Sequence, residues 1–185
     1  MNLNDLLTNL AKPEEDGACN HLLNSTIPDI SLPTQDGNLL KLNRSDTFFL
    51  VIFCYPMTGH PDRPLPENWN LIPGARGCTS QNCSFRDNYD NLIKANALPI
   101  GVSTQSVSDI KEMSIRLHIP YDVVSDQQLI FASALNLPIF SIDKKKFLKR
   151  VTLIIEKSVI KKVFYPIFPP NIHINEVLSW LNRNK

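Results

Sequence analysis

The sequence has few cysteines and no excess of charge of either sign. Four cysteines in 185 residues are far below the density of a small secreted fold held together by disulfides, so we expect cysteine to serve packing or chemistry. The net charge is +1, with acidic and basic residues interspersed, which gives no basis for attraction to nucleic acid or to a membrane surface. The composition therefore argues against a disulfide scaffold and against a binder of polyanions.

Long apolar runs and metal-binding patterns are also missing. No run approaches the roughly 18 apolar residues of a membrane-spanning helix, and Met1–Leu7 lacks the basic start and apolar middle of a secretory signal. The four histidines share no spacing with the cysteines, and the Cys-x-x-Cys pairs of zinc ribbons do not occur. We expect no metal, no bound cofactor, no nucleic-acid partner and no membrane partner. A reducing compartment follows, most simply the cytoplasm.

The length and apolar content predict one domain. A chain of 185 residues with 43% hydrophobic residues can bury a full core but has no length left for a second domain. We assign residues 27–185 to this domain, with a proline-rich insertion at 56–77. Residues 1–26 are expected to form an N-terminal helical appendage, because leucines at 3, 6, 7 and 10 share one face of a short helix.

Strand and helix patterns alternate along the domain. Strands are predicted at 30–32, 39–42, 48–55, 98–103, 121–124, 147–155 and 159–165. Helices are predicted at 107–117, at 129–135 and around 174–181. The turn residues Asp36-Gly37 join the first two strands, and the continuous apolar run at 48–55 is typical of a strand buried on both faces. This order predicts an α/β fold with a central mixed sheet flanked by helices.

Two cysteines five residues apart, Cys78 and Cys83, stand at the beginning of a further predicted helix. Apolar positions at i, i+4, i+7 and i+8 from Phe85 predict that this helix continues to about Asn96. Cys78 then lies at the cap or in the first turn. Unpaired backbone N–H groups and the positive end of the helix dipole favour a thiolate there, and the thiolate is the species that attacks.

The spacing of the two cysteines conflicts with a static disulfide. Residues five apart in an intact helix have Cα atoms roughly 8–9 Å apart with diverging side chains, whereas a disulfide needs Cα atoms within about 7 Å. A bond between Cys78 and Cys83 therefore requires the first turns of the helix to unwind, which favours a switching redox pair. The alternative is two unrelated buried thiols.

The cysteine segment resembles the active-site helix of a known family. Gly77-Cys78-Thr79, with Cys83 and then Phe85-Arg86-Asp87, is similar to that of the Q-type (bacterioferritin-comigratory) peroxiredoxins, in the alkyl hydroperoxide reductase and thiol-specific antioxidant superfamily. Further matches are Tyr55-Pro56 after an apolar strand, Ser103 ending a strand, Ser125-Asp126, and Arg150 opening an apolar strand. The resemblance covers about residues 27–182 and implies a thioredoxin-like fold.

The resemblance also implies an activity and residue roles. It makes Cys78 the peroxidatic cysteine, Cys83 the resolving cysteine, and Arg150 the arginine that faces the peroxide. It implies a thiol-dependent peroxidase that reduces hydrogen peroxide or organic hydroperoxides and is recycled by thioredoxin or a glutaredoxin-like dithiol, as a monomer or homodimer. The alternative for Arg150 is a charge on the hairpin surface, because Lys149 is its neighbour.

One departure from the family pattern concerns the residues before Cys78. The family usually has Pro-x-x-x-Thr-x-x-Cys, with the threonine hydroxyl bonded to the thiolate and the peroxide, but here Leu71 and Ala75 occupy the proline and threonine positions. Thr58, two residues after Pro56, is one candidate for the missing hydroxyl. The other candidate is Arg76 together with backbone N–H groups.

Other readings of the sequence remain open. We interpret Cys54 as core packing and Cys19 as an exposed spectator, with a role as alternative resolving thiol left open for Cys19. Arg86 and Asp87 either form a pair that orients the helix or lie on its solvated face. Two rival functions are a redox sensor or disulfide exchanger on the same fold, and a non-enzymatic interaction module that uses the proline-rich insertion and residues 164–170.

Overall fold

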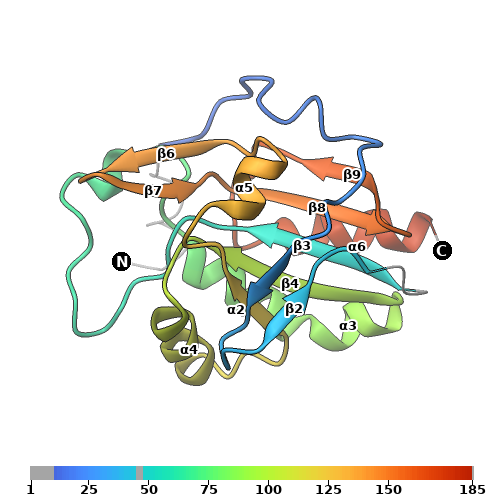
Figure 1. Cartoon of the computed structure of the whole chain (residues 1–185), viewed down its shortest axis with the longest axis horizontal. Coiled ribbons are helices and arrows are strands. Elements are labelled where there is room, and N and C mark those ends of the chain that lie inside the picture. Colours follow the sequence, from blue (N-terminus) through green and yellow to red (C-terminus); the bar gives the residue numbers. More distant parts are fainter. Residues whose placement is uncertain (1–10, 45–47, 185) are drawn as a thin grey trace.

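The centre of the fold is a five-stranded mixed sheet, seen in a computed structural model that describes residues 11–44 and 48–184 (Figure 1). The strands lie in the order β5 (Asp122–Ser125), β4 (Ala97–Ser103), β3 (Phe49–Cys54), β8 (Val151–Glu156) and β9 (Val159–Phe164). β3, β4 and β5 are parallel, whereas β8 is antiparallel to both β3 and β9. The predicted mixed sheet is confirmed.

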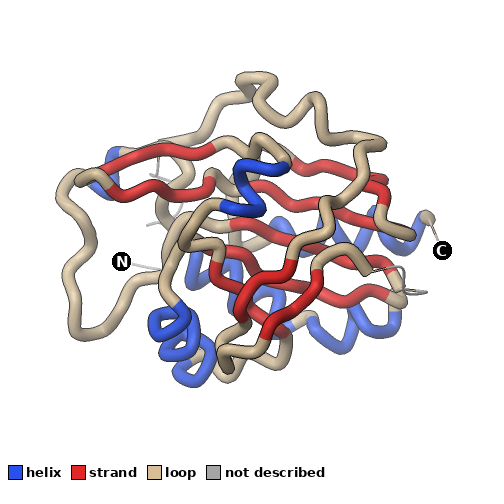
Figure 2. The backbone as a smooth tube through the Cα atoms, viewed as in Figure 1, coloured by secondary structure: helices blue, strands red, loops and turns tan. Residues whose placement is uncertain are grey.

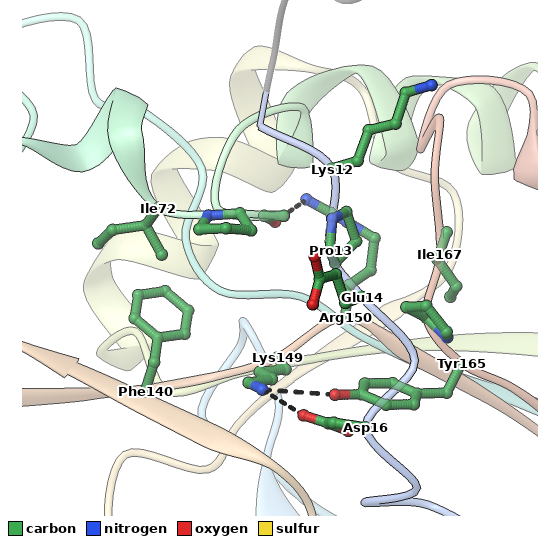
Figure 3. A pocket seen from close by; sticks show the side chains of 13 residues that line it. Lys12, Pro13, Glu14, Asp16, Ile72, Phe140, Lys149, Arg150, Tyr165 and Ile167 are labelled. Atoms are coloured by element: carbon green, nitrogen blue, oxygen red, sulfur yellow. Dashed lines mark hydrogen bonds and ion pairs between the residues drawn. The ribbon is translucent and has the colours of Figure 1, made fainter.

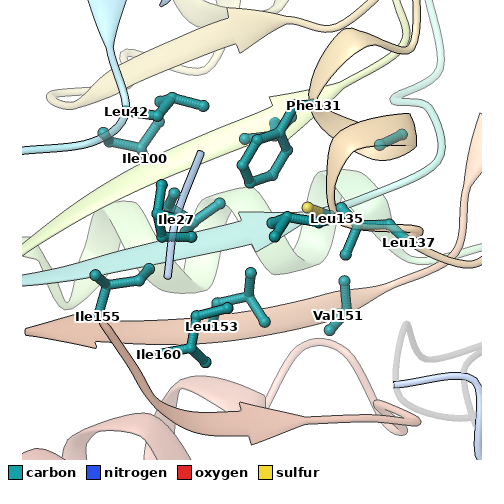
Figure 4. Packing of buried hydrophobic residues seen from close by; sticks show 14 of the residues in the cluster. Ile27, Leu42, Ile100, Phe131, Leu135, Leu137, Val151, Leu153, Ile155 and Ile160 are labelled. Carbon is teal, nitrogen blue, oxygen red and sulfur yellow. The ribbon is translucent and has the colours of Figure 1, made fainter. Parts of the chain in front are cut away.

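The apolar run of β3 is buried because both faces of the sheet are covered. Leu50, Ile52 and Cys54 face one core, and Val51 and Phe53 face another, as the period of two along a strand requires. The first core lies under α5 (Ile130–Ala134) and the hairpin of β1 (Ser31–Pro33) and β2 (Leu39–Lys41). Figure 4 shows part of this core.

The second face of the sheet carries the remaining helices. They are α2 (Cys78–Asp87), α3 (Tyr89–Lys94), α4 (Val107–Arg116) and α6 (His173–Arg183). The helices predicted at 107–117, at 129–135 and around 174–181 and the Asp36-Gly37 hairpin are confirmed. Among the residues that the structure describes, no helix is long and apolar enough to span a membrane.

The helix predicted to run from Cys78 to about Asn96 is in fact two helices. α2 ends at Asp87 and α3 begins at Tyr89, with Asn88 between them at φ −109° and ψ 14°. The Asn88 side chain donates to the Ser84 carbonyl at 3.0 Å, and such side-chain bonds compete with helix continuation. Ile93, the i+8 position of the apolar pattern that starts at Phe85, lies after this break and is 43% exposed instead of buried with the rest of that face.

The strand predicted at 147–155 is also divided. β7 (Lys145–Leu148) pairs with β6 (Ile139–Ile142), which the sequence analysis missed, in a separate two-stranded sheet, and the chain enters the main sheet only at β8. Phe147 is the reason, because it packs in a satellite cluster with Trp69 and Phe140 away from the main core. Arg150 therefore lies in the short connection between β7 of the small sheet and β8 of the main sheet.

The N-terminal region and the insertion have little regular structure. The helix predicted through the leucines at 3–10 lies outside the described residues. Residues 11–26 are irregular and carry Leu22 and Cys19 into the first core. Residues 56–77 form a long loop with one short helical turn, η1 (Trp69–Leu71) (Figure 2).

Candidate active site

Cys78 is the first residue of α2, as predicted. Gly77 caps the helix with φ +94°, and its carbonyl accepts the Gln81 N–H at 2.9 Å. A side chain at position 77 would place a Cβ 2.4 Å from Cγ of Pro170, so both the backbone angle and the space require glycine. Cys78 is 2% exposed, and its Sγ lies 3.5 Å from the Ala75 carbonyl oxygen.

Arg150 contacts the sulfur of Cys78. Its Nη2 lies 3.3 Å from Sγ and donates to the carbonyls of Gly74 at 3.2 Å and Arg76 at 3.0 Å. Arg150 is 4% exposed, so the alternative of a surface charge is wrong. This places a positive charge beside the sulfur, where the buried surroundings screen it little. Lys149 points elsewhere, to Asp16 at 2.8 Å.

Gln81 and Asn82 belong to the site, although the sequence analysis did not single them out. Gln81 is fully buried, and its Oε1 accepts a hydrogen bond from Nη1 of Arg150. Asn82 donates to the Cys78 carbonyl at 3.0 Å, and the Tyr121 hydroxyl donates to the Asn82 carbonyl at 2.8 Å. The spacing could have indicated Gln81 as a site residue, because a residue three positions after Cys78 lies on the same face of the helix.

Three buried donor groups near Cys78 have no hydrogen-bond partner among the described residues. They are Nε2 of Gln81, Nε of Arg150 and, by strict hydrogen-bond geometry, the hydroxyl of Tyr55, which has the Asn82 side chain beside it. Burial, and then the neighbouring Cys78, raise the pKa of Tyr55, so its hydroxyl keeps the proton that it can donate. Unpaired buried donors cost free energy. A small ligand that carries oxygen acceptors would satisfy them beside the sulfur.

Cys83 lies half-buried in the same helix, and the structure records all four cysteines as free. The end of α2 is fixed by Arg86, which bonds Asp87 at 2.8 Å and the Leu117 carbonyl, just after α4, at 2.7 Å. Arg86 and Asp87 therefore do form a pair, but Asp87 lies on the solvated face with its side chain 61% exposed, and it is the bond from Arg86 to Leu117 that joins α2 to the chain after α4. The start of α2 has no such side-chain tie to α4 in the described hydrogen bonds.

Thr58 is buried, but its hydroxyl bonds Gln105. The hydroxyl donates to Gln105 Oε1 at 3.1 Å, and the Thr58 N–H donates to the same oxygen at 2.9 Å. Within the described residues no hydrogen bond joins Thr58 to Cys78. Arg76 is exposed, and it is its carbonyl that meets Arg150. Neither candidate side chain is thus bonded to the sulfur, and a role for Thr58 in turnover stays a prediction.

The other two cysteines are both buried. Cys54 is fully buried in β3, and burial raises the pKa of its thiol, in agreement with core packing. The expectation that Cys19 is exposed is wrong, since it is 5% exposed and packs in the first core. Burial, followed by Asp16 and Glu15, raises the pKa of Cys19 to about 12, which makes it a poor nucleophile.

The described residues contain no group of three or more His, Cys, Asp or Glu that could hold a metal ion. What the site offers instead is a buried sulfur at a helix start, a guanidinium in contact with it and several donors close by. This arrangement can stabilise a thiolate and the negative charge that develops on an oxygen beside it.

Comparisons with known proteins agree with this chemistry. The Redoxin family model matches residues 22–179. Peroxiredoxin Q, chloroplastic, of Oryza sativa subsp. japonica is 27% identical over 158 residues, which are 85% of this chain and 65% of that protein. Putative peroxiredoxin bcp of Coxiella burnetii is 24% identical over 160 residues, which are 83% of this chain and 94% of that protein. The chain thus spans slightly less than two thirds of the length of the rice relative.

Solved structures share the fold. Peroxidoxin BcpB from Mycobacterium tuberculosis superposes with a TM-score of 0.73 at 23% identity, covering 88% of this chain and 97% of that one. The bacterioferritin comigratory protein of Xanthomonas campestris, described for its alkyl peroxide reduction activity, gives 0.67 at 18% identity, covering 95% and 99%. The expected thioredoxin-like fold and the resemblance to Q-type peroxiredoxins are confirmed.

Proposed function

We propose that this chain, which belongs to the Redoxin family, is a thiol-dependent peroxidase that reduces hydrogen peroxide or organic hydroperoxides. The observation that carries the proposal is the contact of Arg150 Nη2 with Cys78 Sγ at 3.3 Å at the first residue of α2. The relatives named peroxiredoxin Q and bcp support it. Cys78 is the peroxidatic cysteine in this proposal, and Arg150 the group that faces the peroxide.

The first step is attack of the Cys78 thiolate on one peroxide oxygen. The S–O bond forms as the O–O bond breaks, and the second oxygen leaves as hydroxide or alkoxide and takes up a proton to give water or an alcohol. Cys78 is left as a sulfenic acid. Arg150, Gln81 and Tyr55 supply donors that were in place before the charge develops, which is the efficient form of electrostatic catalysis.

The second step is condensation of Cys83 with the sulfenic acid, which releases water and forms the Cys78–Cys83 disulfide. The helix must open at its start, which breaks the Asn82 bond to the Cys78 carbonyl and the Tyr121 bond to Asn82. The Arg86 bond to Leu117 lies beyond both cysteines and can hold the far end of α2. Unwinding is therefore confined to about the first turn and a half.

A dithiol then reduces the disulfide by exchange, becoming oxidised itself. Thioredoxin or a glutaredoxin-like protein has the required chemistry, and a reducing compartment such as the cytoplasm contains both. A monomer or a homodimer is compatible with a site that one chain builds alone. Plant relatives are described as chloroplastic, so tagging the full protein in its own cell and imaging it is the measurement that decides the compartment.

The roles are tested by peroxide consumption with a thioredoxin system. Wild-type protein should turn over continuously, Cys78→Ser should consume no peroxide, and Cys83→Ser should consume one equivalent and stop as a sulfenic acid that dimedone labels at Cys78. Cys54→Ala is the control, because Cys54 lies in the core and outside the site. No consumption by the wild-type protein overturns the proposal, and dimedone on Cys83 in Cys78→Ser reverses the two roles.

The unwinding step is tested by hydrogen exchange on the reduced and oxidised protein. The disulfide, confirmed by mass, should lower protection in residues 79–85 while β3 and β4 keep theirs. Residues 88–94 should change little, because Arg86 fixes the end of α2. Equal protection of 79–85 in both forms contradicts the switching mechanism.

A further inference from the structure

A cavity of about 390 Å³ lies beside Arg150, and the N-terminal segment forms one of its walls (Figure 3). Residues 12–16 run across it, while Ile72 of the insertion and Phe140 of β6 approach from one side and Tyr165 and Ile167 from the other. The volume falls in the range of sites that hold small organic molecules, and the apolar side chains around it suit an organic group.

The cavity borders the proposed reaction centre, although Cys78 itself is not among the residues that line it. Arg150 and Gly74 both line it. The Arg150 guanidinium contacts Cys78 Sγ and the Gly74 carbonyl, and its Nε is a buried donor without a partner among the described residues. A molecule in the cavity therefore lies against Arg150, the residue that faces the peroxide in the proposed function.

The N-terminal wall is held by contacts at both of its ends. The Gly74 N–H donates to the Ala11 carbonyl at 3.3 Å, and Pro13 packs against Gly74. At the other end, Asp16 pairs with Lys149 Nζ at 2.8 Å, and Lys149 also bonds the Tyr165 hydroxyl at 3.5 Å. Lys149 is thus the link between the wall and the cavity, one residue away from Arg150.

We propose that residues 11–16 complete a binding site for the organic group of a hydroperoxide, and that the Asp16–Lys149 pair determines how well this group binds. The inference rests on the proposed peroxidase function and adds to it a specificity residue outside the reacting centre. Hydrogen peroxide has no organic group and makes no use of the wall. Loss of the pair should therefore affect organic hydroperoxides alone.

The test compares Asp16→Asn with a matched control, Asp29→Asn. Asp29 also pairs with a lysine, Lys41, at 2.8 Å, but lies outside the cavity lining. The measurement is steady-state kinetics with cumene hydroperoxide and with hydrogen peroxide. Asp16→Asn should raise KM for cumene hydroperoxide about two- to five-fold, the size expected for one partly exposed ion pair. The kcat of Asp16→Asn and its kcat/KM for hydrogen peroxide should be unchanged. Asp29→Asn should keep the wild-type kinetic constants for both peroxides.

A binding measurement separates this inference from the proposed function. Reduced full-length protein is titrated with cumyl alcohol, the product of cumene hydroperoxide, and amide NMR shifts are followed. Shifts should gather at Ile72, Gly74 and residues 11–16, and the affinity should fall in Asp16→Asn but not in Asp29→Asn. The inference is wrong if no shifts appear at these residues, if Asp16→Asn leaves the KM for cumene hydroperoxide unchanged, or if it affects both peroxides equally. An inactive wild-type protein that still binds the alcohol there refutes the peroxidase function alone.

Discussion

Replacing Arg150 by methionine should slow reaction with peroxide about 10- to 150-fold. Arg150 Nη2 lies 3.3 Å from Cys78 Sγ, and a hydrogen bond to a charged group contributes about 1.5–3 kcal/mol. At about 1.4 kcal/mol for each factor of ten, this contribution gives the expected range of rates. Methionine keeps an apolar stem of similar length but removes every donor.

The assay is stopped-flow oxidation of the reduced protein by hydrogen peroxide at about pH 7 and again at about pH 9.5, above the titration range of an ordinary thiol. If Arg150 only favoured the thiolate, the difference from the wild-type protein would disappear at the higher pH. If Arg150 also stabilises the leaving oxygen, most of the rate difference between the wild-type protein and Arg150→Met should persist at the higher pH. Urea denaturation accompanies the kinetics, because Arg150 also bonds the carbonyls of Gly74 and Arg76 and its loss should cost about 1–3 kcal/mol of stability.

The matched control is Arg63→Met. Arg63 is an arginine with a side-chain partner, the carboxylate of Asp109, and its side chain is 57% exposed. This variant should keep the wild-type rate at both pH values. A folded Arg150→Met protein that reacts as fast as Arg63→Met at both pH values would refute the assignment of Arg150.

Three smaller predictions follow from single residues. Gly77→Ala should lower the free energy of unfolding by about 1–3 kcal/mol in urea, because alanine is strained at φ +94° and its Cβ meets Pro170; an unchanged midpoint would contradict this. Cys54→Ala should cost about 1 kcal/mol of stability and leave peroxide turnover intact, so a folded but inactive variant would rule out a purely packing role. Burial lowers the pKa of His173, whose ring bonds Glu176, so wild-type stability should be complete above about pH 6.5 and fall as the pH drops below it. His173→Gln should flatten that fall in urea titrations at several pH values, and an identical slope would exclude His173 as its cause.

The elements governed by local pattern could be predicted from the sequence. The apolar run at 48–55, the turn at Asp36-Gly37 and the helix start at Cys78 all follow from interactions between near neighbours in the chain. The break at Asn88 was missed because a side-chain bond to Ser84 overrode the apolar periodicity on both sides of it. β6 was missed because it is short and only partly buried, and its pairing with β7 outside the main sheet is not encoded in its own pattern.

Local patterns in the chain were enough to predict the mixed α/β fold, the placement of Cys78 at a helix start and the spacing that prevents a disulfide in an intact helix. The contact of Arg150, and not of Lys149, with the sulfur depends on how distant parts of the chain pack. The chain changes sheets between β7 and β8, and the two side chains meet different partners. Tertiary packing also buried Cys19 and joined Gln81 to Arg150. Such contacts join residues far apart in the chain, and no local pattern records which distant surfaces will meet.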